Sequence, residues 1–465
     1  MTGENRSRGS LFVTSDGRNV LFTFTLVSSL FLLWGFCNGM IDVMDKHFQE
    51  ELHLSLSQSA WVQFAHYLGY FLMSLPAGWL ATRFGYKGGI ILGLLLVAVG
   101  GFWFIPATRI VAFWAFLLGV CLIASGLAFL ETVANPYATV LGSEQFAAIR
   151  INLAQSCNGI GWILGPIAGA IFFYSEDPAG HSTGSELLWV PYAGVGIVVL
   201  VLAAVFYMVD IPDLQGRVGN PQRSSGREIS RSLWDRPHFT MAVAAQFLYV
   251  AAQAGIFSFL INYLAAEPPA ISSDWRSGMA RLATHTPGWA TGLFSGWFQP
   301  APAGGLAISN KLASYLSSFA FGCFLVGRLS GAALLRRISA HKLLSLYAIM
   351  NVILCFLVFC KLGWLSVICV FLSYFFMSIM FPTIFALGIF DLGAQAKKAS
   401  SYIVMAIVGG ALLPKLMGAV ADRYNVSRGF IVPLLCFIFI AYYGYRWPKY
   451  SKAESLRNLE IVRSH

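Results

Sequence analysis

The sequence has little charge for its length. Asp, Glu, Lys and Arg together make up 11% of its 465 residues, whereas a soluble domain carries about 25%. Hydrophobic residues supply 57% of the chain, so it lacks the polar residues needed for a fully wetted surface. This composition excludes a disordered protein, a nucleic-acid-binding module and an ordinary soluble enzyme. It indicates a polytopic membrane protein.

The sequence also lacks the patterns that bind metals or perform catalysis. None of the eight cysteines forms a Cys-x-x-Cys or Cys/His ligand pattern, and all lie in apolar segments, where small buried side chains are expected. These apolar segments contain no histidine pair and no Ser/Lys dyad. We therefore expect no disulfide, no metal site, no cofactor and no catalytic constellation, and we interpret the protein as a non-enzyme.

Twelve apolar runs are long enough to cross the ~30 Å hydrocarbon core of a bilayer, which takes roughly 20 helical residues. The sequence therefore predicts an all-α membrane protein with twelve transmembrane helices. The runs cover approximately residues 20–44, 57–81, 88–106, 111–138, 149–173, 187–209, 238–264, 309–335, 341–360, 363–390, 399–421 and 429–447.

Positive charge is distributed unevenly between the loops. With the N-terminus in the cytoplasm, the cytoplasmic segments hold 21 of the 31 Lys and Arg residues and the outer loops hold 7. By the positive-inside rule this bias predicts that both termini are cytoplasmic. The first span is too long for a signal-peptide core, so we expect it to remain as a membrane helix. The net charge of +10 reflects topology, and we expect no nucleic-acid partner.

The twelve spans divide into two halves of six. Residues 1–209 and 238–465 each predict a six-helix bundle, and residues 210–237, rich in Pro, Gly, Ser and Arg, predict a cytoplasmic linker between them. A repeat supports this division, because the loops GWLATRFGYKGG (78–89) and GAALLRRISAHK (331–342) both place a Gly five residues before an Arg.

One outer loop is much longer than the others. Residues 265–308 contain five prolines, and a loop of this length is usually functional or disordered. Its stretch GWATGLFSGWFQ predicts an amphipathic segment on the outer interface, where Trp is favoured. We assign no function to it.

Two carboxylates lie within the predicted spans, Asp42 in the first and Glu131 in the fourth. The other acidic residues are predicted in loops, in tails or at span ends. A charged side chain at mid-bilayer costs roughly 2.5–3.5 kcal/mol on insertion scales and usually marks a proton or substrate path. No Lys or Arg lies near Glu131 on its own span, so burial favours its neutral form.

The two acids are predicted at different depths. Asp42 lies about 35 Å of helical rise from Asn19, nearer the outer side, and Glu131 lies nearer the inner side of an inward-running helix. This arrangement suits a proton relay. The alternative is a pair of protonated acids that only bond one helix to another.

Amide and aromatic side chains cluster in the same spans. A sugar site needs amides for the ring hydroxyls and apolar surface for the ring faces. Gln246, Tyr249 and Gln253 recur at helical spacing, so they share one face of the seventh span. Any single amide could instead join helices. The candidates are Trp34, Asn38, Asn135, Asn152, Gln155 and Asn158 in the first half, and Gln246, Tyr249, Gln253, Asn262 and Tyr263 in the second.

Several of these segments resemble a known family. LWGFCNGMIDVMDKHFQ (33–49), FLETVANPYATVLG (129–142), RINLAQSCNGIG (150–161), AQFLYVAAQAGIFSFLINY (245–263) and SSYIVMAIVGGALLP (400–414) closely resemble the fucose–galactose–glucose:proton symporter family of the major facilitator superfamily. The resemblance covers nearly the whole chain apart from the tails and the 265–308 loop. It implies two pseudo-symmetric six-helix bundles, a sugar site between them at the midplane, and alternating access by rocking.

The resemblance also implies roles for individual residues. Asp42 matches the family's acid for sugar binding and coupling, and Glu131 matches the acid tied to proton translocation. Gln155 and Asn158 match cavity-facing polar residues. Trp34 and Asn38 match the lining of the first helix. Glucose/galactose-type members carry Gln where this chain has Glu131, so this chain sides with the fucose type.

Three positions depart from the pattern. Phe381 stands where fucose-type members have a Tyr, which removes a hydroxyl from the cavity wall. Thr82 replaces an acid that is common in the superfamily's loop. Lys415 is an unexpected cation in the eleventh span, and it could either snorkel outward or compensate a cavity acid.

The resemblance implies a monomeric carrier in the plasma (inner) membrane that couples protons to monosaccharide uptake, with L-fucose or a related 6-deoxyhexose as the expected substrate. A glucose, galactose or mannose carrier that is proton-coupled, sodium-coupled or passive is the alternative. A drug or metabolite exporter would be expected to lack the amide run. A non-transporting sugar sensor is a remote alternative, since neither tail supplies an output domain.

Overall fold

The structure is a computed structural model. It describes residues 12–13, 19–110, 112–141, 147–174, 188–209, 233–271, 296–300, 305–335, 337–390, 392 and 396–451. Most of the predicted linker, residues 210–232, lies outside the described residues.

The N-terminal half is made of long helices. They are α1 (Leu21–Glu51), the short α2 (Leu56–Ser59), α3 (Trp61–Ile110), α4 (Phe113–Val140), α5 (Ala147–Phe173) and α7 (Trp189–Met208). α3 contains the second and third predicted spans joined at a kink, where Gly85 takes φ 74° and ψ 177°. Only glycine adopts this conformation without strain, so a single residue turns the chain between two spans.

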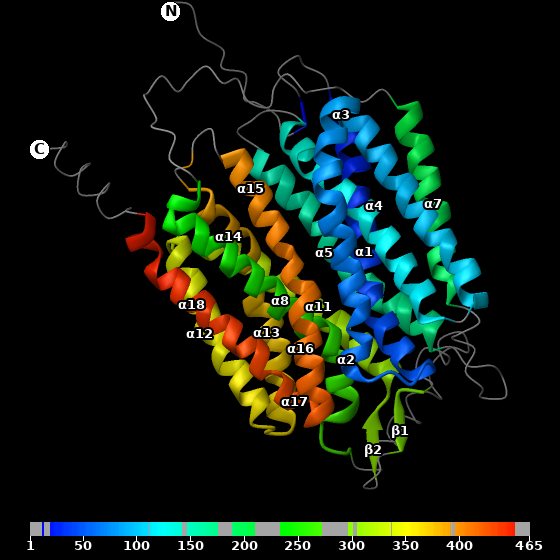
Figure 1. Ribbon diagram of the computed structural model, residues 1–465, viewed down its shortest axis with the longest axis vertical. Coiled ribbons are helices and arrows are strands. Elements are labelled where there is room, and N and C mark those ends of the chain that lie inside the picture. Colours follow the sequence, from blue (N-terminus) through cyan, green and yellow to red (C-terminus); the bar gives the residue numbers. More distant parts are fainter. Residues whose placement is uncertain are drawn as a thin grey trace, which may run out of the picture.

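The C-terminal half contains shorter helices. They are η3 (Leu233–Asp235), α8 (Pro237–Ala266), α11 (Asn310–Leu334), α12 (Ala340–Phe359), α13 (Trp364–Met377), α14 (Met380–Gly388), α15 (Ala396–Met405), η5 (Ala406–Val408), α16 (Gly409–Arg423), α17 (Val426–Gly429) and α18 (Ile431–Ser451). The predicted spans 363–390 and 399–421 are therefore both interrupted helices. Figure 1 shows the two halves side by side, with α1 to α7 on one side and α12 to α18 on the other.

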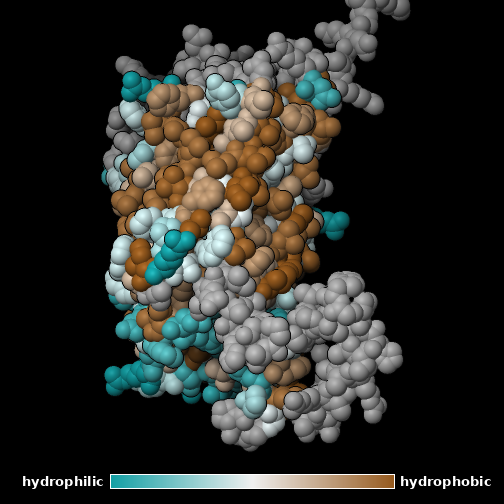
Figure 2. Space-filling model, turned by 90° about the vertical axis from the view of Figure 1, so that its right-hand side faces the viewer, coloured by the Kyte–Doolittle hydropathy of each residue, from teal (hydrophilic) through white to brown (hydrophobic). Residues whose placement is uncertain are grey.

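The expectation of twelve membrane spans is confirmed. Eleven helical segments of the described chain are long and apolar enough to cross a membrane, and the first part of α3, residues 61–82, supplies the twelfth. Large apolar side chains such as Trp79, Ile197 and Leu435 are exposed on the surface. Figure 2 shows one face on which apolar side chains form a broad band with hydrophilic residues gathered beyond it, as expected for a belt that contacts lipid.

Glycines let α1 and α5 pack closely. A Cβ atom placed on Gly35 would lie 2.0 Å from the Asn158 carbonyl oxygen, and one on Gly161 would lie 2.2 Å from the Leu32 carbonyl oxygen. Such contacts are possible only without a side chain, which is the usual reason for small residues at membrane-helix interfaces. The close packing fixes the positions of the polar side chains on both helices.

A small hairpin closes one end of the bundle. β1 (Phe298–Pro300) pairs antiparallel with β2 (Leu306–Ile308), beside α2 and α17 at the end drawn lowest in Figure 1. We call this the hairpin end, and the charge distribution predicts that it faces outward. Most of the predicted amphipathic stretch lies outside the described residues. Its last two residues, Phe298 and Gln299, belong to β1.

Candidate functional site

Asp42 is buried at the interface between the two halves. Its side chain is 3% exposed, and Gln63 Nε2 on α3 donates a hydrogen bond of 2.9 Å to its Oδ1. Its Oδ2 has no hydrogen-bond partner among the described residues. A buried carboxylate with a free oxygen is costly when charged, so this environment favours the protonated form.

A small cavity adjoins Asp42, and we call it the Asp42 cavity. Its volume of about 10 Å³ is at the lower limit for one water molecule. It is lined by Asn38, Ile41, Asp42, Gln63, His66, Tyr67 and Trp162 from the N-terminal half and by Ala254 and Phe257 of α8. Both halves therefore contribute to its wall.

Trp34 and Asn38 lie about two turns and one turn before Asp42 on α1, respectively. Trp34 Nε1 donates to the Tyr70 hydroxyl at 2.6 Å. Asn38 is buried, and its Oδ1 has no hydrogen-bond partner in the described part of the chain. The predicted helix-1 lining is thus brought together on one face of α1, next to polar groups of α3.

Glu131 lies on α4 and is half-buried. We find no hydrogen bond or ion pair of its carboxylate with any described residue. Tyr67 and Tyr70 on α3 are close enough to interact with it electrostatically. Since it has no described cation partner, the neutral form of its carboxyl group is the less costly one inside the membrane.

Asn135 and Gln155 connect α4 to α5. Asn135 Nδ2 donates to the Glu131 carbonyl oxygen at 3.0 Å, and Gln155 Nε2 donates to Asn135 Oδ1 at 3.2 Å. These two predicted residues therefore form a polar chain beside Glu131.

Asn158 has a different environment. Its Nδ2 donates to the Phe31 carbonyl oxygen at 3.2 Å, across the closely packed α1–α5 interface. In this conformation its amide joins two helices, which is the alternative considered for every amide. The side chain of Asn152 lies outside the described residues.

The polar residues of α8 face the interior of the C-terminal half. Gln246 is 0% exposed, and neither of its amide atoms has a hydrogen-bond partner among the described residues. The Tyr249 hydroxyl donates to the Met377 carbonyl oxygen at 3.0 Å. Phe381 packs edge-on against the Tyr249 ring with centroids 6.4 Å apart, and Gln253 is half-buried.

The break between α13 and α14 lies beside these residues. A helix break frees carbonyl groups that must find other donors inside a membrane. Tyr249 takes the Met377 carbonyl, and Arg328 Nε approaches the Ser378 carbonyl oxygen at 3.5 Å. The guanidinium of Arg328 also lies 5.0 Å from the Phe324 ring.

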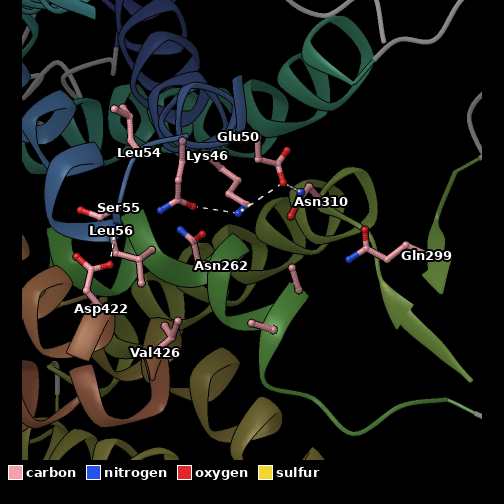
Figure 3. Close-up of a pocket in the computed structure, with 13 residues that line it drawn as sticks. Lys46, Glu50, Leu54, Ser55, Leu56, Asn262, Gln299, Asn310, Asp422 and Val426 are labelled. Atoms are coloured by element: carbon pink, nitrogen blue, oxygen red, sulfur yellow. Dashed lines mark hydrogen bonds and ion pairs between the residues drawn. The ribbon is translucent and has the colours of Figure 1, made fainter. Parts of the chain in front are cut away.

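A second pocket opens at the hairpin end (Figure 3). It has a volume of about 350 Å³ and is lined by both halves, including Lys46, Gln49, Glu50, Asn262, Asn310 and Asp422. Asn262 therefore lies in this pocket and not beside Asp42. Tyr263 packs on Phe430 with ring centroids 5.6 Å apart.

Polar contacts hold the halves together at the hairpin end. Asp422 on α16 accepts hydrogen bonds from the backbone nitrogens of Leu56 at 2.7 Å and Ser57 at 2.8 Å, which lie at the start of α2. Asn310 on α11 donates to Glu50 on α1. The structure is therefore closed at this end.

Lys415 belongs to the same closure. Its Nζ lies 3.7 Å from the centroid of the Trp61 ring, and its side chain is exposed. The cation stacks on an aromatic ring of the other half. The described partner of Lys415 is therefore the Trp61 ring and not an acid of the cavity.

The sequence interpretation missed several residues of this region. Gln63, His66, Tyr67 and Tyr70 share one face of α3, and their spacing of i, i+3, i+4 and i+7 was available as a signal. The prediction for Asp45 was wrong. It was placed in a loop after a span ending at residue 44, whereas α1 continues to Glu51 and buries it.

Comparisons with known proteins agree with this architecture. The model of the Major Facilitator Superfamily matches residues 23–389. A glucose/galactose transporter of Brucella abortus is 33% identical over 432 residues, covering 93% of this chain and 95% of the relative. The L-fucose-proton symporter of Escherichia coli is 34% identical over 445 residues, covering 91% and 93%.

Solved structures show the same relationship. The transporter FucP, crystallised in the outward conformation, matches with a TM-score of 0.63 and 33% identity, covering 92% of this chain and 99% of FucP. A D-xylose-proton symporter matches with a TM-score of 0.64 but only 13% identity, which supports the fold alone. Two bundles of membrane helices, a polar interface between them and a family match over most of the sequence lead to one conclusion: the chain belongs to the Major Facilitator Superfamily.

Proposed function

We propose that this protein is a proton-coupled symporter that takes up a monosaccharide, with L-fucose or a related 6-deoxyhexose as its substrate. The observation that carries the proposal is the pair Asp42 and Glu131. Both lie within membrane helices and neither has a cation partner among the described residues. The 34% identical L-fucose-proton symporter supports both the coupling ion and the substrate class.

In the proposed mechanism, protons from outside neutralise Glu131 and Asp42. A neutral carboxyl crosses the low-dielectric interior at far lower cost than a carboxylate, so the loaded carrier can change conformation. Sugar binds among Trp34, Asn38 and the α8 amides. Its binding is energetically coupled to protonation of the two acids, because both involve the same polar network. The proton then leaves to the more alkaline cytoplasm, and the free carrier returns.

The same proposal sets the orientation. The excess of Lys and Arg in the loops opposite the hairpin end supports a plasma (inner) membrane carrier with both termini in the cytoplasm. We infer a monomer, since each half finds its partner within the same chain.

A glucose or galactose carrier is the second candidate. The 33% identical glucose/galactose transporter favours it, and so does Phe381, which offers no hydroxyl to the substrate. Substrate choice depends on one or two hydrogen bonds, and a site built to bind a hydroxyl rejects analogues that lack it.

Uptake of labelled L-fucose into proteoliposomes, with and without an inward proton gradient, tests the proposal. D-glucose, D-galactose and D-mannose serve as competitors, and a sodium gradient serves as the ion control. We expect the proton gradient to drive fucose accumulation. If a hexose competed better than L-fucose, the proposed substrate would be wrong. If uptake did not depend on the proton gradient, the proposed coupling ion would be wrong.

A further inference from the structure

Asp45 is a buried carboxyl group that the proposed mechanism does not use. Its side chain is 2% exposed, and neither carboxylate oxygen has a hydrogen-bond partner among the described residues. An ionised carboxylate in this position would have little compensation for its lost hydration. The group is therefore stable mainly as the neutral, protonated acid.

Asp45 lies on α1 between two cavities. Asp42, one turn before it in the helix, lines the Asp42 cavity, and Gln49, one turn after it, lines the hairpin-end pocket. Residues three and four positions apart are neighbours on a helix surface. Asp45 thus occupies the step between the pocket drawn in Figure 3 and the coupling acid.

The groups around Asp45 leave it without a dedicated cation. Lys46 bonds Gln49 at 3.0 Å and pairs with Glu50 at 3.6 Å. On α2, the Ser59 hydroxyl donates to the Leu56 carbonyl oxygen.

One further neighbour of Asp45 is a titratable group. This is Tyr174 at the end of α5, which interacts with Asp45 electrostatically and whose hydroxyl has no hydrogen-bond partner among the described residues. In the Asp42 cavity, Nδ1 of His66 on α3 also has no described partner. Asp42, one turn away on the same helix, interacts electrostatically with Asp45, and two interacting carboxyl groups share protons more readily than both ionise.

We propose that Asp45 relays protons between the hairpin-end pocket and Asp42. No hydrogen bond joins Asp45 to Asp42 in this conformation, so a water molecule carries the proton between them. The O–H bond of the Asp45 carboxyl breaks as that water accepts the proton, and an O–H bond of the water breaks as one to the Asp42 carboxylate forms. The Asp45 carboxylate then takes a proton from hydronium in the hairpin-end pocket, which leaves water. This proposal rests on the proposed function, because it requires that the carrier moves protons with sugar.

Two assays separate a relay from a structural role. Counterflow of labelled sugar needs conformational exchange but no net proton movement, whereas sugar-driven acidification of liposomes containing pyranine measures proton entry. The variants are Asp45→Asn, Asp45→Ser and Asp45→Glu. Glu51→Gln is the matched control, since it removes an exposed carboxylate from the same end of α1.

For Asp45→Asn and Asp45→Ser we expect proton entry to fall at least about tenfold with counterflow within about twofold of wild type, as for removal of one transfer step in series. Asp45→Glu should restore proton entry, and Glu51→Gln should leave both assays unchanged. Proton entry at the wild-type rate in both polar variants would overturn the relay, and so would a parallel loss of both activities. If wild-type protein moved sugar without protons, the proposed function itself would fail. This outcome is read from wild type alone, so it is distinguishable from a failure of the relay, which is read from the variants.

Discussion

The two halves of this transporter differ in charge and in helix continuity. The described interior of the N-terminal half contains the acids Asp42, Asp45 and Glu131 on long helices, whereas that of the C-terminal half offers amides, aromatic rings and Arg328 around interrupted helices. Interrupted helices expose carbonyl groups for binding and bending. Under the proposed mechanism, this difference places proton chemistry in one half and conformational adaptability in the other.

Removing a coupling acid from the N-terminal half should have the largest effect. We expect Glu131→Gln to lose gradient-driven accumulation by at least about tenfold, because the side chain can no longer load a proton. Counterflow should persist, since a neutral amide mimics the protonated acid. Uptake by wild type should rise as outer pH falls, and uptake by the variant should not. If Glu131→Gln accumulated sugar to the wild-type level, the assignment of proton coupling to Glu131 in the N-terminal half would be wrong.

Packing gives a second test of that comparison. Gly35→Ala places a Cβ 2.0 Å from the Asn158 carbonyl oxygen, and relieving such a clash costs about 1–3 kcal/mol. We expect a lower Tm in detergent. Gly322→Ala in α11 is the matched control, since nothing lies within 4 Å of the new Cβ, and it should hold or raise Tm. Equal Tm shifts in the two variants would show that α1–α5 packing is not rigid.

The C-terminal half is expected to influence sugar affinity without influencing coupling. Gln246→Leu removes a buried amide that has no described partner, so Tm should not fall. If that amide binds sugar, KM should rise about tenfold, equivalent to about 1.4 kcal/mol. Ser258→Ala, which removes another buried and unpartnered group of α8, should leave KM unchanged. A loss of proton coupling in Gln246→Leu would place coupling chemistry in both halves.

The contact between the halves at the hairpin end should give the smallest effect. Lys415→Met removes the cation from the Trp61 ring, a contact worth about 0.5–1 kcal/mol at an exposed site. This energy shifts the balance between open and closed forms roughly two- to fivefold. Electron paramagnetic resonance distance measurements between spin labels on α2 and α16 should show a larger population of the open form, with a longer distance between the labels. Arg423→Met, a nearby cation on the same helix, should show no shift.

Much of the fold follows from local chain properties. The length and apolarity of each span predicted the membrane helices, because hydration of backbone and side chains decides which segments enter lipid. The predicted end of the first span, residue 44, was too early, because α1 ends at Glu51. The sequence after residue 44 is mostly polar, yet α1 continues to Glu51, and its last turns are packed on α4 by Phe48, whose ring centroid lies 4.5 Å from that of Phe116. That error hid Asp45.

Sequence alone determined the twelve spans and the presence of Asp42 and Glu131 within them, since a carboxylate in an apolar run is visible without coordinates. Tertiary structure decided the partners: Gln63 for Asp42, the α1 backbone for Asn158, the Trp61 ring for Lys415 and none among the described residues for Asp45. The physical reason is range. Hydropathy is a property of each segment by itself. A hydrogen bond, or a buried polar atom without a partner, depends on how helices distant in sequence pack against one another.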